Sequence, residues 1–337
     1  MFAYIVRRTI AIVIMLFAIS VFTYVLFFAI PRDPARLTCG KTCTPELINQ
    51  NRHALGLDRS VAVQYGEFLK GLVVSRDFPD DPRLARTHPE LITHCDAPCL
   101  GYSPSQQTTI NNVMGRAAPV TLSLTVGAFV LWMVVGVGLG VLSALRRGSI
   151  VDKALLSVSL IGYSFPTFFV GLIIYDIVSV KYGLLPAPGY VSPTTDLGGW
   201  ISGMLAPWIT LALAYTALYV RLTRAKMLDS MSSEYIRTAR AKGVRSHRVI
   251  LKHGLRSSLP PIVTIAGLDI AGLLGAAAIT EQVFNLDGIG STVIAAVKDA
   301  DLPIIVVGVL IAATVVVVAN FVVDLLYAAI DPKVRYT

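Results

Sequence analysis

Charged residues are scarce in this 337-residue chain: Asp, Glu, Lys and Arg together make up 15% of it. A soluble domain of average composition carries about 25% charged residues. Hydrophobic residues reach 54%. Because so little charge is left to cover a water-facing surface, the composition excludes an ordinary soluble fold and predicts an integral membrane protein.

The chain also lacks a complete phosphate-binding loop. Gly40-Lys41-Thr42 matches the end of the motif G-x-x-x-x-G-K-[ST], but Ala35 stands where its first glycine belongs. The glycine runs at 136–140 and 272–275 neither follow a strand nor begin a helix, so they predict close helix packing and not a dinucleotide site. No catalytic constellation is persuasive. We therefore predict no enzymatic activity and no cofactor bound by this chain, so that any ATP and Mg²⁺ belong to another subunit.

Long apolar runs are abundant. A transmembrane helix needs about 20 mostly apolar residues. Six segments are predicted to cross the membrane: Thr9–Ile30, Ala118–Leu145, Ala154–Val180, Met204–Val220, Ile262–Ile279 and Leu302–Ile330. The first is too long for a cleaved signal peptide, and no A-x-A cleavage site follows it. The sequence therefore predicts an all-α membrane protein with six transmembrane helices.

The basic residues alternate between rich and poor loops. Ten Lys and Arg lie between Arg221 and Arg256, whereas Lys298 is the one base between the last two apolar segments. Since lysine and arginine concentrate in cytoplasmic loops, both termini and the loop 221–261 are predicted to be cytoplasmic. The predicted organisation is an N-terminal transmembrane helix (1–30), an extracytoplasmic insert (31–110) and a core of five transmembrane helices (111–337).

All four cysteines fall in this predicted insert, as two CxxxC pairs, Cys39 with Cys43 and Cys95 with Cys99. An outer compartment permits disulfides, so we predict two bridges. Four cysteines allow three connectivities: two that join one pair to the other, and one with a local bridge in each pair. The rival hypothesis is a metal or iron–sulfur site with four thiolate ligands.

The stretch Glu234–Pro261 carries seven bases and one acid between two apolar segments. Ser232 or Ser233 can cap a short helix that ends at Gly243. Tyr235, Ile236 and Ala239 share one face of it by helical spacing, with the arginines around them. A helix of about ten residues is unstable alone in water and needs a partner surface.

Three interpretations of this loop compete. It could be a solvated basic loop, or the stripe Arg245, Arg248, Lys252 and Arg256 could bind anionic lipid. The third interpretation, which we favour, is a docking helix for a cytoplasmic protein. The acidic residue Asp269, near the middle of the fifth apolar segment, is a second functional candidate because a charge at that depth usually faces a cavity or a partner. It could attract the positive N-terminus of a peptide or pair with a polar group of another subunit.

The loop resembles the EAA loop of ABC importer permease subunits of the dipeptide/oligopeptide (peptide/nickel) family. Glu234–Gly243 and Leu259-Pro260 carry the resemblance, and Arg237-Thr238-Ala239 stands where the general pattern has Glu-Ala-Ala, a departure that the peptide branch shares. Further blocks resemble the family in order along the chain: Ile30–Pro34, Leu55–Asp58, Glu281–Phe284, Gly288–Gly290, Tyr327 and Asp331–Tyr336. The paired cysteines and residues 76–106 are not typical of it.

This resemblance implies a type I ABC importer permease fold in a bacterial inner membrane. It implies three kinds of partner: a second homologous permease, two cytoplasmic ATPase subunits and an extracytoplasmic substrate-binding (lipo)protein, with no nucleic acid. The cargo would be di- or oligopeptides, with nickel chelates or glutathione as alternatives; an ATP-independent channel or a membrane-anchored scaffold is the competing class. The implied coupling residues are Glu234, Tyr235, Ile236, Arg237, Ala239, Arg240 and Gly243, and the substrate-path candidates are Asp269 and Glu281.

Overall fold

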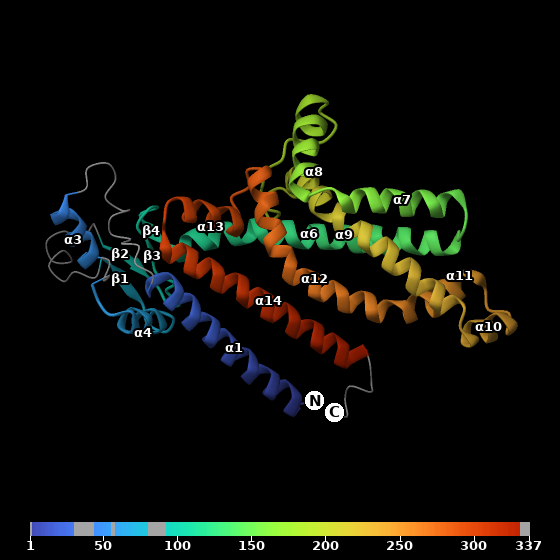
Figure 1. The fold of residues 1–337 in the computed structure, drawn as a ribbon, viewed down its shortest axis with the longest axis horizontal. Coiled ribbons are helices and arrows are strands. Elements are labelled where there is room, and N and C mark those ends of the chain that lie inside the picture. Colours follow the sequence, from blue (N-terminus) through green and yellow to red (C-terminus); the bar gives the residue numbers. More distant parts are fainter. Residues whose placement is uncertain (1, 30–43, 55–57, 80–91, 331–337) are drawn as a thin grey trace. The chain divides into compact units, whose positions relative to one another are not determined.

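The computed structural model describes residues 2–29, 44–54, 58–79 and 92–330. The chain folds into two compact units, traced in chain order in Figure 1. Unit 1 comprises Met1–Pro119 and Asp287–Val317, and unit 2 comprises Val120–Leu286 and Val318–Thr337. The structure is mostly helical, which agrees with the predicted class.

Unit 1 combines membrane-length helices with small peripheral elements. Its helices are α1 (Phe2–Ala29), α3 (Pro45–Ala54), α4 (Val61–Gly71), the start of α6 (Ile110–Leu145), α13 (Ile289–Lys298) and the first part of α14 (Leu302–Ile330). Helices α3 and α4 are both short, with 10 and 11 residues. The apolar helix α13 was not predicted; Gly288, from the Gly288–Gly290 block, forms its N-cap.

Two small antiparallel sheets lie in the described parts of residues 76–109, although the sequence predicts an all-α protein. Strand β1 (Arg76–Phe78) pairs with β2 (Thr93–Cys95), and β3 (Tyr102–Ser103) pairs with β4 (Thr108–Thr109). The prediction failed here because strands of two or three residues are too short to show a period of two. The all-α prediction therefore needs this small correction.

One disulfide joins Cys95 to Cys99, and both residues are buried. This local pairing excludes, in this structure, the two connectivities that join one CxxxC pair to the other. Cys39 and Cys43 lie outside the described residues. The bridge also leaves neither Cys95 nor Cys99 as a thiolate ligand for a metal, and in the described part of the chain no group of three or more His, Cys, Asp or Glu could hold one.

A buried carboxylate fixes the start of α14 in unit 1. Asp301 is 4% exposed and accepts hydrogen bonds from the hydroxyl groups of Ser103 and Ser105, both at 2.6 Å. It also accepts from the backbone N–H of Ile304 at 3.4 Å, within the first turn of the helix. Asp301 thus caps α14 and ties that helix to the β3 region.

Unit 2 contains most of α6 and the helices that follow it. They are α7 (Ile150–Ser164), α8 (Thr167–Ile173), the π-helix η2 (Ile174–Lys181), α9 (Leu197–Met231), α10 (Glu234–Ala241), α11 (Ser246–Arg248), the π-helix η3 (Val249–Leu255) and α12 (Arg256–Val283). Figure 1 shows α7 and α12 beside α9, and both pack against it.

The segment Ala154–Val180, predicted as one span, is broken. The helices on either side of the break, Ile150–Ser164 and Thr167–Lys181, meet at 101°. Phe165 between them is extended, with φ −88° and ψ 135°. The following Pro166 explains this, since proline disfavours helical geometry in the residue before it and has no N–H to continue the ladder.

Two other predicted spans are longer than expected. Helix α9 runs through 35 residues and includes Pro207, which we had expected within a short span ending at Val220. Helix α12 begins at Arg256, ahead of the Pro260-Pro261 pair, and Ser246–Ile270 meets Gly275–Val283 at 62°. In the described residues, four helices are individually long and apolar enough to cross a membrane, and the two bent pairs raise the number to six if each is one span.

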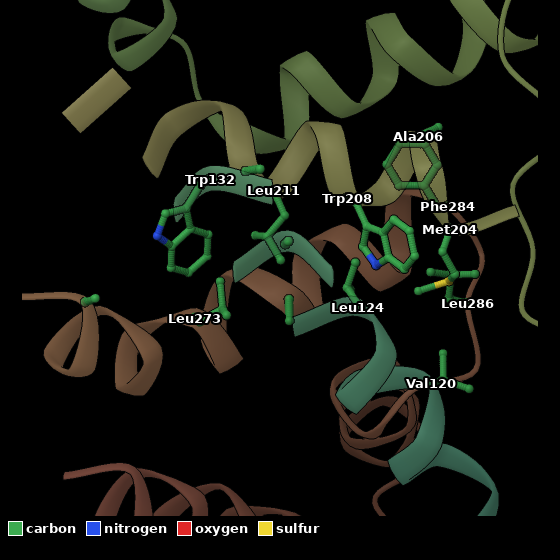
Figure 2. Close-up of a cluster of buried hydrophobic side chains, with 14 of the residues drawn as sticks. Val120, Leu124, Trp132, Met204, Ala206, Trp208, Leu211, Leu273, Phe284 and Leu286 are labelled. Carbon is green, nitrogen blue, oxygen red and sulfur yellow. The ribbon is translucent and has the colours of Figure 1, made fainter. Parts of the chain in front are cut away.

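The core of unit 2 forms where α6, α9 and α12 meet. Its fully buried side chains include Leu124 and Trp132 from α6, Leu211 from α9 and Leu273 from α12 (Figure 2). The indole N–H of Trp208 donates to the carbonyl oxygen of Ser123 at 2.9 Å, so α9 is also hydrogen-bonded to α6. Packing and interhelical hydrogen bonds are the interactions that join helices in a bilayer, where lipid is as apolar as the core.

The two glycine runs differ in how closely other parts of the chain pack against them. A Cβ at Gly136 would lie 2.8 Å from Tyr219 Cβ, and one at Gly140 would lie 2.6 Å from Thr223 Cβ, so close packing of α6 on α9 is confirmed there. A Cβ at Gly272 or Gly275 would meet nothing within 4 Å in this chain. The packing prediction for 272–275 is therefore wrong within the chain; these glycines flank the bend in α12.

Replacing Gly140 with alanine is expected to destabilise the protein by about 1–3 kcal/mol through overpacking. The new Cβ would also lie 2.8 Å from the carbonyl oxygen of Val220, and backbone cannot swing aside. Gly138→Ala is the matched control on the same helix, because its Cβ would meet nothing within 4 Å. Thermal unfolding of the two purified variants should show a lower midpoint for Gly140→Ala alone; equal midpoints would contradict this packing.

Candidate functional site

The basic loop folds into a helical arm between two membrane helices. Helix α9 ends at Met231, α10 follows, and the chain then returns through α11 and η3 into α12 (Figure 1). Ser233 is the N-cap of α10, and Gly243 follows the helix with φ +73°. That left-handed angle suits glycine, so the predicted start and end of the short helix are confirmed.

The faces of α10 differ from the prediction. Ile236 is 0% exposed, covered by its own chain, while Ala239 is half-buried. Tyr235 is 46% exposed, and Glu234, Arg237, Arg240 and Gly243 are exposed too. We had expected Tyr235, Ile236 and Ala239 to meet a partner together. Because α10 packs on η3, Ile236 serves the fold of this chain, and the surface left for a partner contains Tyr235 and the arginines.

A cluster of three hydroxyl groups ties α10 to both membrane helices. Tyr235 Oη lies 2.8 Å from Ser230 Oγ near the end of α9 and 2.7 Å from Ser257 Oγ at the start of α12. Ser230 Oγ and Ser257 Oγ are themselves 2.6 Å apart. Three mutual hydrogen bonds allow little relative movement, so α10 is attached to α9 and α12 as one body.

A second contact between α9 and the start of α12 lies one turn deeper. Ser258 is 2% exposed, and its hydroxyl group donates to the carbonyl oxygen of Lys226 at 3.1 Å. A Cβ at Gly254 would lie 2.9 Å from the sulfur of Met231, so η3 and the end of α9 approach each other closely there. The four bases of the predicted stripe, Arg245, Arg248, Lys252 and Arg256, are exposed.

A buried ion pair joins α7 to α9, and sequence reasoning missed it. Asp152 is 2% exposed; Arg224 donates to its two oxygens from Nε at 2.7 Å and from Nη2 at 2.8 Å. Asp152 also accepts from Ser143 Oγ at 2.5 Å and from the N–H of Gly148 at 2.8 Å. This four-donor carboxylate holds α6, the 146–149 turn and α7 against α9. We refer to it as the Asp152 clamp.

A local signal for the clamp was present in the sequence. Ser149 is the N-cap of α7, and its hydroxyl group accepts from the N–H of Asp152. The spacing Ser-x-x-Asp is the capping pattern that begins a helix with an acid in its first turn. The pattern could have predicted the position of Asp152, but not its pairing with Arg224, 72 residues away.

The two substrate-path candidates lie in different environments. Asp269 is partly buried on α12 and accepts a hydrogen bond from Tyr219 Oη at 2.7 Å. Glu281 is 0% exposed and accepts from Thr121 Oγ1 at 2.6 Å, which fastens the end of α12 to α6. The structure does not bring the two together. Because Glu281 is enclosed, it serves packing here and offers no open surface to a cargo.

Comparison with protein families and known proteins gives consistent matches along the chain. Residues 136–336 match the model of the binding-protein-dependent transport system inner membrane component, and residues 1–125 match the model of its N-terminal part. A probable peptide ABC transporter permease protein of Sinorhizobium fredii is 32% identical over 333 residues, 99% of each chain. The glutathione transport system permease protein GsiC of Escherichia coli is 33% identical over 337 residues, all of each chain.

A solved structure matches the fold at lower identity. An inward-facing structure of the MetNI methionine ABC transporter aligns with a TM-score of 0.51 and 20% identity. The alignment covers 65% of this chain and 96% of that chain. At this identity the likeness concerns the fold, and it supports the type I ABC importer permease arrangement of helices.

Proposed function

We propose that this chain is a peptide permease subunit, because it belongs to the family of binding-protein-dependent transport system inner membrane components. Members of this family are multi-pass membrane components of ABC importers. It forms, with a second homologous permease, the path for di- or oligopeptides that an external binding protein delivers. Two partner ATPase subunits bind ATP and Mg²⁺, and this chain binds no cofactor. The observation that carries the proposal is the short helix α10, which is exposed on one face and held on the other by the hydrogen bond between Tyr235 and Ser257.

The proposed topology follows from the charge pattern. Six transmembrane helices, with α7–η2 and α12 each counted as one bent span, leave the loop 221–261 and both termini in the cytoplasm. Residues 31–110 then form an extracytoplasmic insert ahead of the core 111–337. The disulfide between Cys95 and Cys99 suits that outer compartment, where thiols are not kept reduced.

The mechanism we propose uses α10 as a lever. An ATPase subunit that holds the exposed face of α10 would displace it when the nucleotide sites close. The hydroxyl cluster of Ser230, Tyr235 and Ser257 passes this movement to α9 and α12, and the Asp152 clamp passes it to α7. Rigid bodies that move together can switch a path between inward-open and outward-open states.

The cargo proposal rests on the relatives named as peptide permeases. A relative of equal similarity is named for glutathione, so a glutathione-type cargo is the second candidate; nickel chelates are the third. An ATP-independent channel would not require the fastened helix α10.

Transport by the reconstituted importer tests this proposal. The chain, its second permease, the ATPase subunits and the binding protein are placed in liposomes with a labelled dipeptide, a labelled tripeptide or labelled glutathione. We expect uptake of a peptide that requires ATP and the binding protein. If glutathione is taken up and neither peptide is, glutathione replaces peptides as the proposed cargo. Uptake without ATP would contradict the importer mechanism.

A further inference from the structure

A carboxyl group at the middle of a membrane helix has no ion-pair partner among the described residues. Asp269 lies halfway along the 28 residues of α12 and is partly exposed. A charged group at such depth is costly, and proteins that keep one usually pair it or turn it toward a cavity. Its hydrogen-bond donor in the described residues is the neutral hydroxyl group of Tyr219, at 2.7 Å.

No base of the described residues neutralises this carboxylate with an ion pair. Arg221, two residues after Tyr219 on α9, lies over the ring of Tyr163 at 5.3 Å from its centroid. Arg224, also on α9, is engaged in the buried ion pair with Asp152. The hydrogen bond from Tyr219 orients Asp269, and within the described residues no cation pairs with it.

Aromatic rings stand beside the carboxylate. Tyr215 and Tyr219 are one turn apart on α9 and therefore share a face of that helix. Trp132 stacks on Tyr215 with ring centroids 4.4 Å apart and lies 6.2 Å from Tyr219. Its indole N–H is buried without a hydrogen-bond partner in the described part of the chain. Trp132 and Tyr219 are fully buried and Tyr215 is half-buried, so within this cluster the ring of Tyr215 is the one that can offer a face to an organic cation.

We propose that Asp269, with Tyr215 and Tyr219 beside it, binds a primary ammonium group of the transported cargo within the membrane. Tyr219 positions the carboxylate, and the ring of Tyr215 contributes a cation–π contact. The inference rests on the proposed function for its biological cargo: the free amino group of a peptide supplies the ammonium. The site would then favour cargo with an unblocked N-terminus after release from the binding protein.

A titration that needs neither ATP nor peptide tests the site. Phenethylamine is added to the chain purified with its partner subunits in lipid nanodiscs, and tryptophan fluorescence is followed because Trp132 lies in the cluster. Phenethyl alcohol is the uncharged comparison. We expect a saturable change with the amine alone, weakened about tenfold or more in Asp269→Asn, since the substitution removes the charge that the ammonium group pairs with. Asp269→Glu should retain binding, and Asp176→Asn, an exposed acid in η2, should not affect it.

The same titration can also contradict the proposal. Equal binding of amine and alcohol, unchanged binding in Asp269→Asn, or no saturable change in the native chain each overturns the proposal. If Asp269→Asn separates the two permeases on size-exclusion chromatography, whereas Asp269→Glu keeps them together, Asp269 pairs with a base of the partner permease and the cargo site is rejected. Failure of peptide uptake in liposomes would overturn the proposed function without altering any of these results.

Discussion

Replacing Arg237 and Arg240 together with glutamate is expected to release the ATPase subunits while the chain stays folded in the membrane. Both side chains are exposed on α10, and Arg237 is paired with Glu234 at 2.8 Å in a contact that is 71% and 83% exposed. Such a surface pair contributes about 0–1 kcal/mol to stability, so its loss leaves the fold intact. Like charges brought together at an interface cost several kcal/mol.

The measurement is the amount of ATPase that co-purifies with a tagged chain. A cost of about 2 kcal/mol lowers the binding constant by more than tenfold. Lys153→Glu is the control, because Lys153 is an exposed base that lies on α7 and not on α10. Retention of the ATPases by the Arg237/Arg240 variant, or their loss in the Lys153 control, would contradict a docking role for α10. Deleting residues 234–243 should also lose the ATPases, but it removes Ile236 from the packing and is therefore less specific.

Replacing Asp152 with alanine is expected to cost about 3–5 kcal/mol of stability, because it leaves a largely buried arginine without its acid. The side chain of Arg224 is 22% exposed, and two further donors, the hydroxyl group of Ser143 and the backbone N–H of Gly148, lose the same acceptor. Removing both charges, as in Asp152→Ala with Arg224→Ala, should cost less than the sum of the single changes. The difference between the cost of the double change and the sum of the two single costs is the interaction energy of Asp152 with Arg224.

Unfolding of the four variants in detergent, followed by temperature or denaturant, provides the test. Glu234→Ala is the matched control: it breaks the exposed pair with Arg237 and is expected to change stability by less than about 1 kcal/mol. Additive effects of Asp152→Ala and Arg224→Ala would show that the two side chains act independently. In the importer, loss of the clamp should also reduce transport per ATP hydrolysed, since α7 would no longer follow α9.

Several local features could be read from the sequence. Ser233 and Gly243 bound α10 as predicted, because caps depend on the residue at the position and on its backbone angle. The spacing of Gly136 and Gly140 predicted close packing, and both meet α9. The break at Phe165-Pro166 was missed although its signal is local: within a long apolar run, hydropathy conceals the effect of one proline on the ladder.

Hydropathy and charge along the chain determined that this is a multi-pass membrane protein with a basic loop between its fourth and fifth apolar segments, because the transfer of each segment into a bilayer is decided by its own residues. The sequence also determined that Tyr235, Ile236 and Ala239 lie on one side of a helix. The tertiary structure decided that Ile236 is buried inside this chain and that Tyr235 forms hydrogen bonds at its surface. It likewise paired Asp152 with Arg224 and Tyr219 with Asp269. Helical periodicity specifies which residues share a face, whereas what covers that face depends on segments far away in the chain.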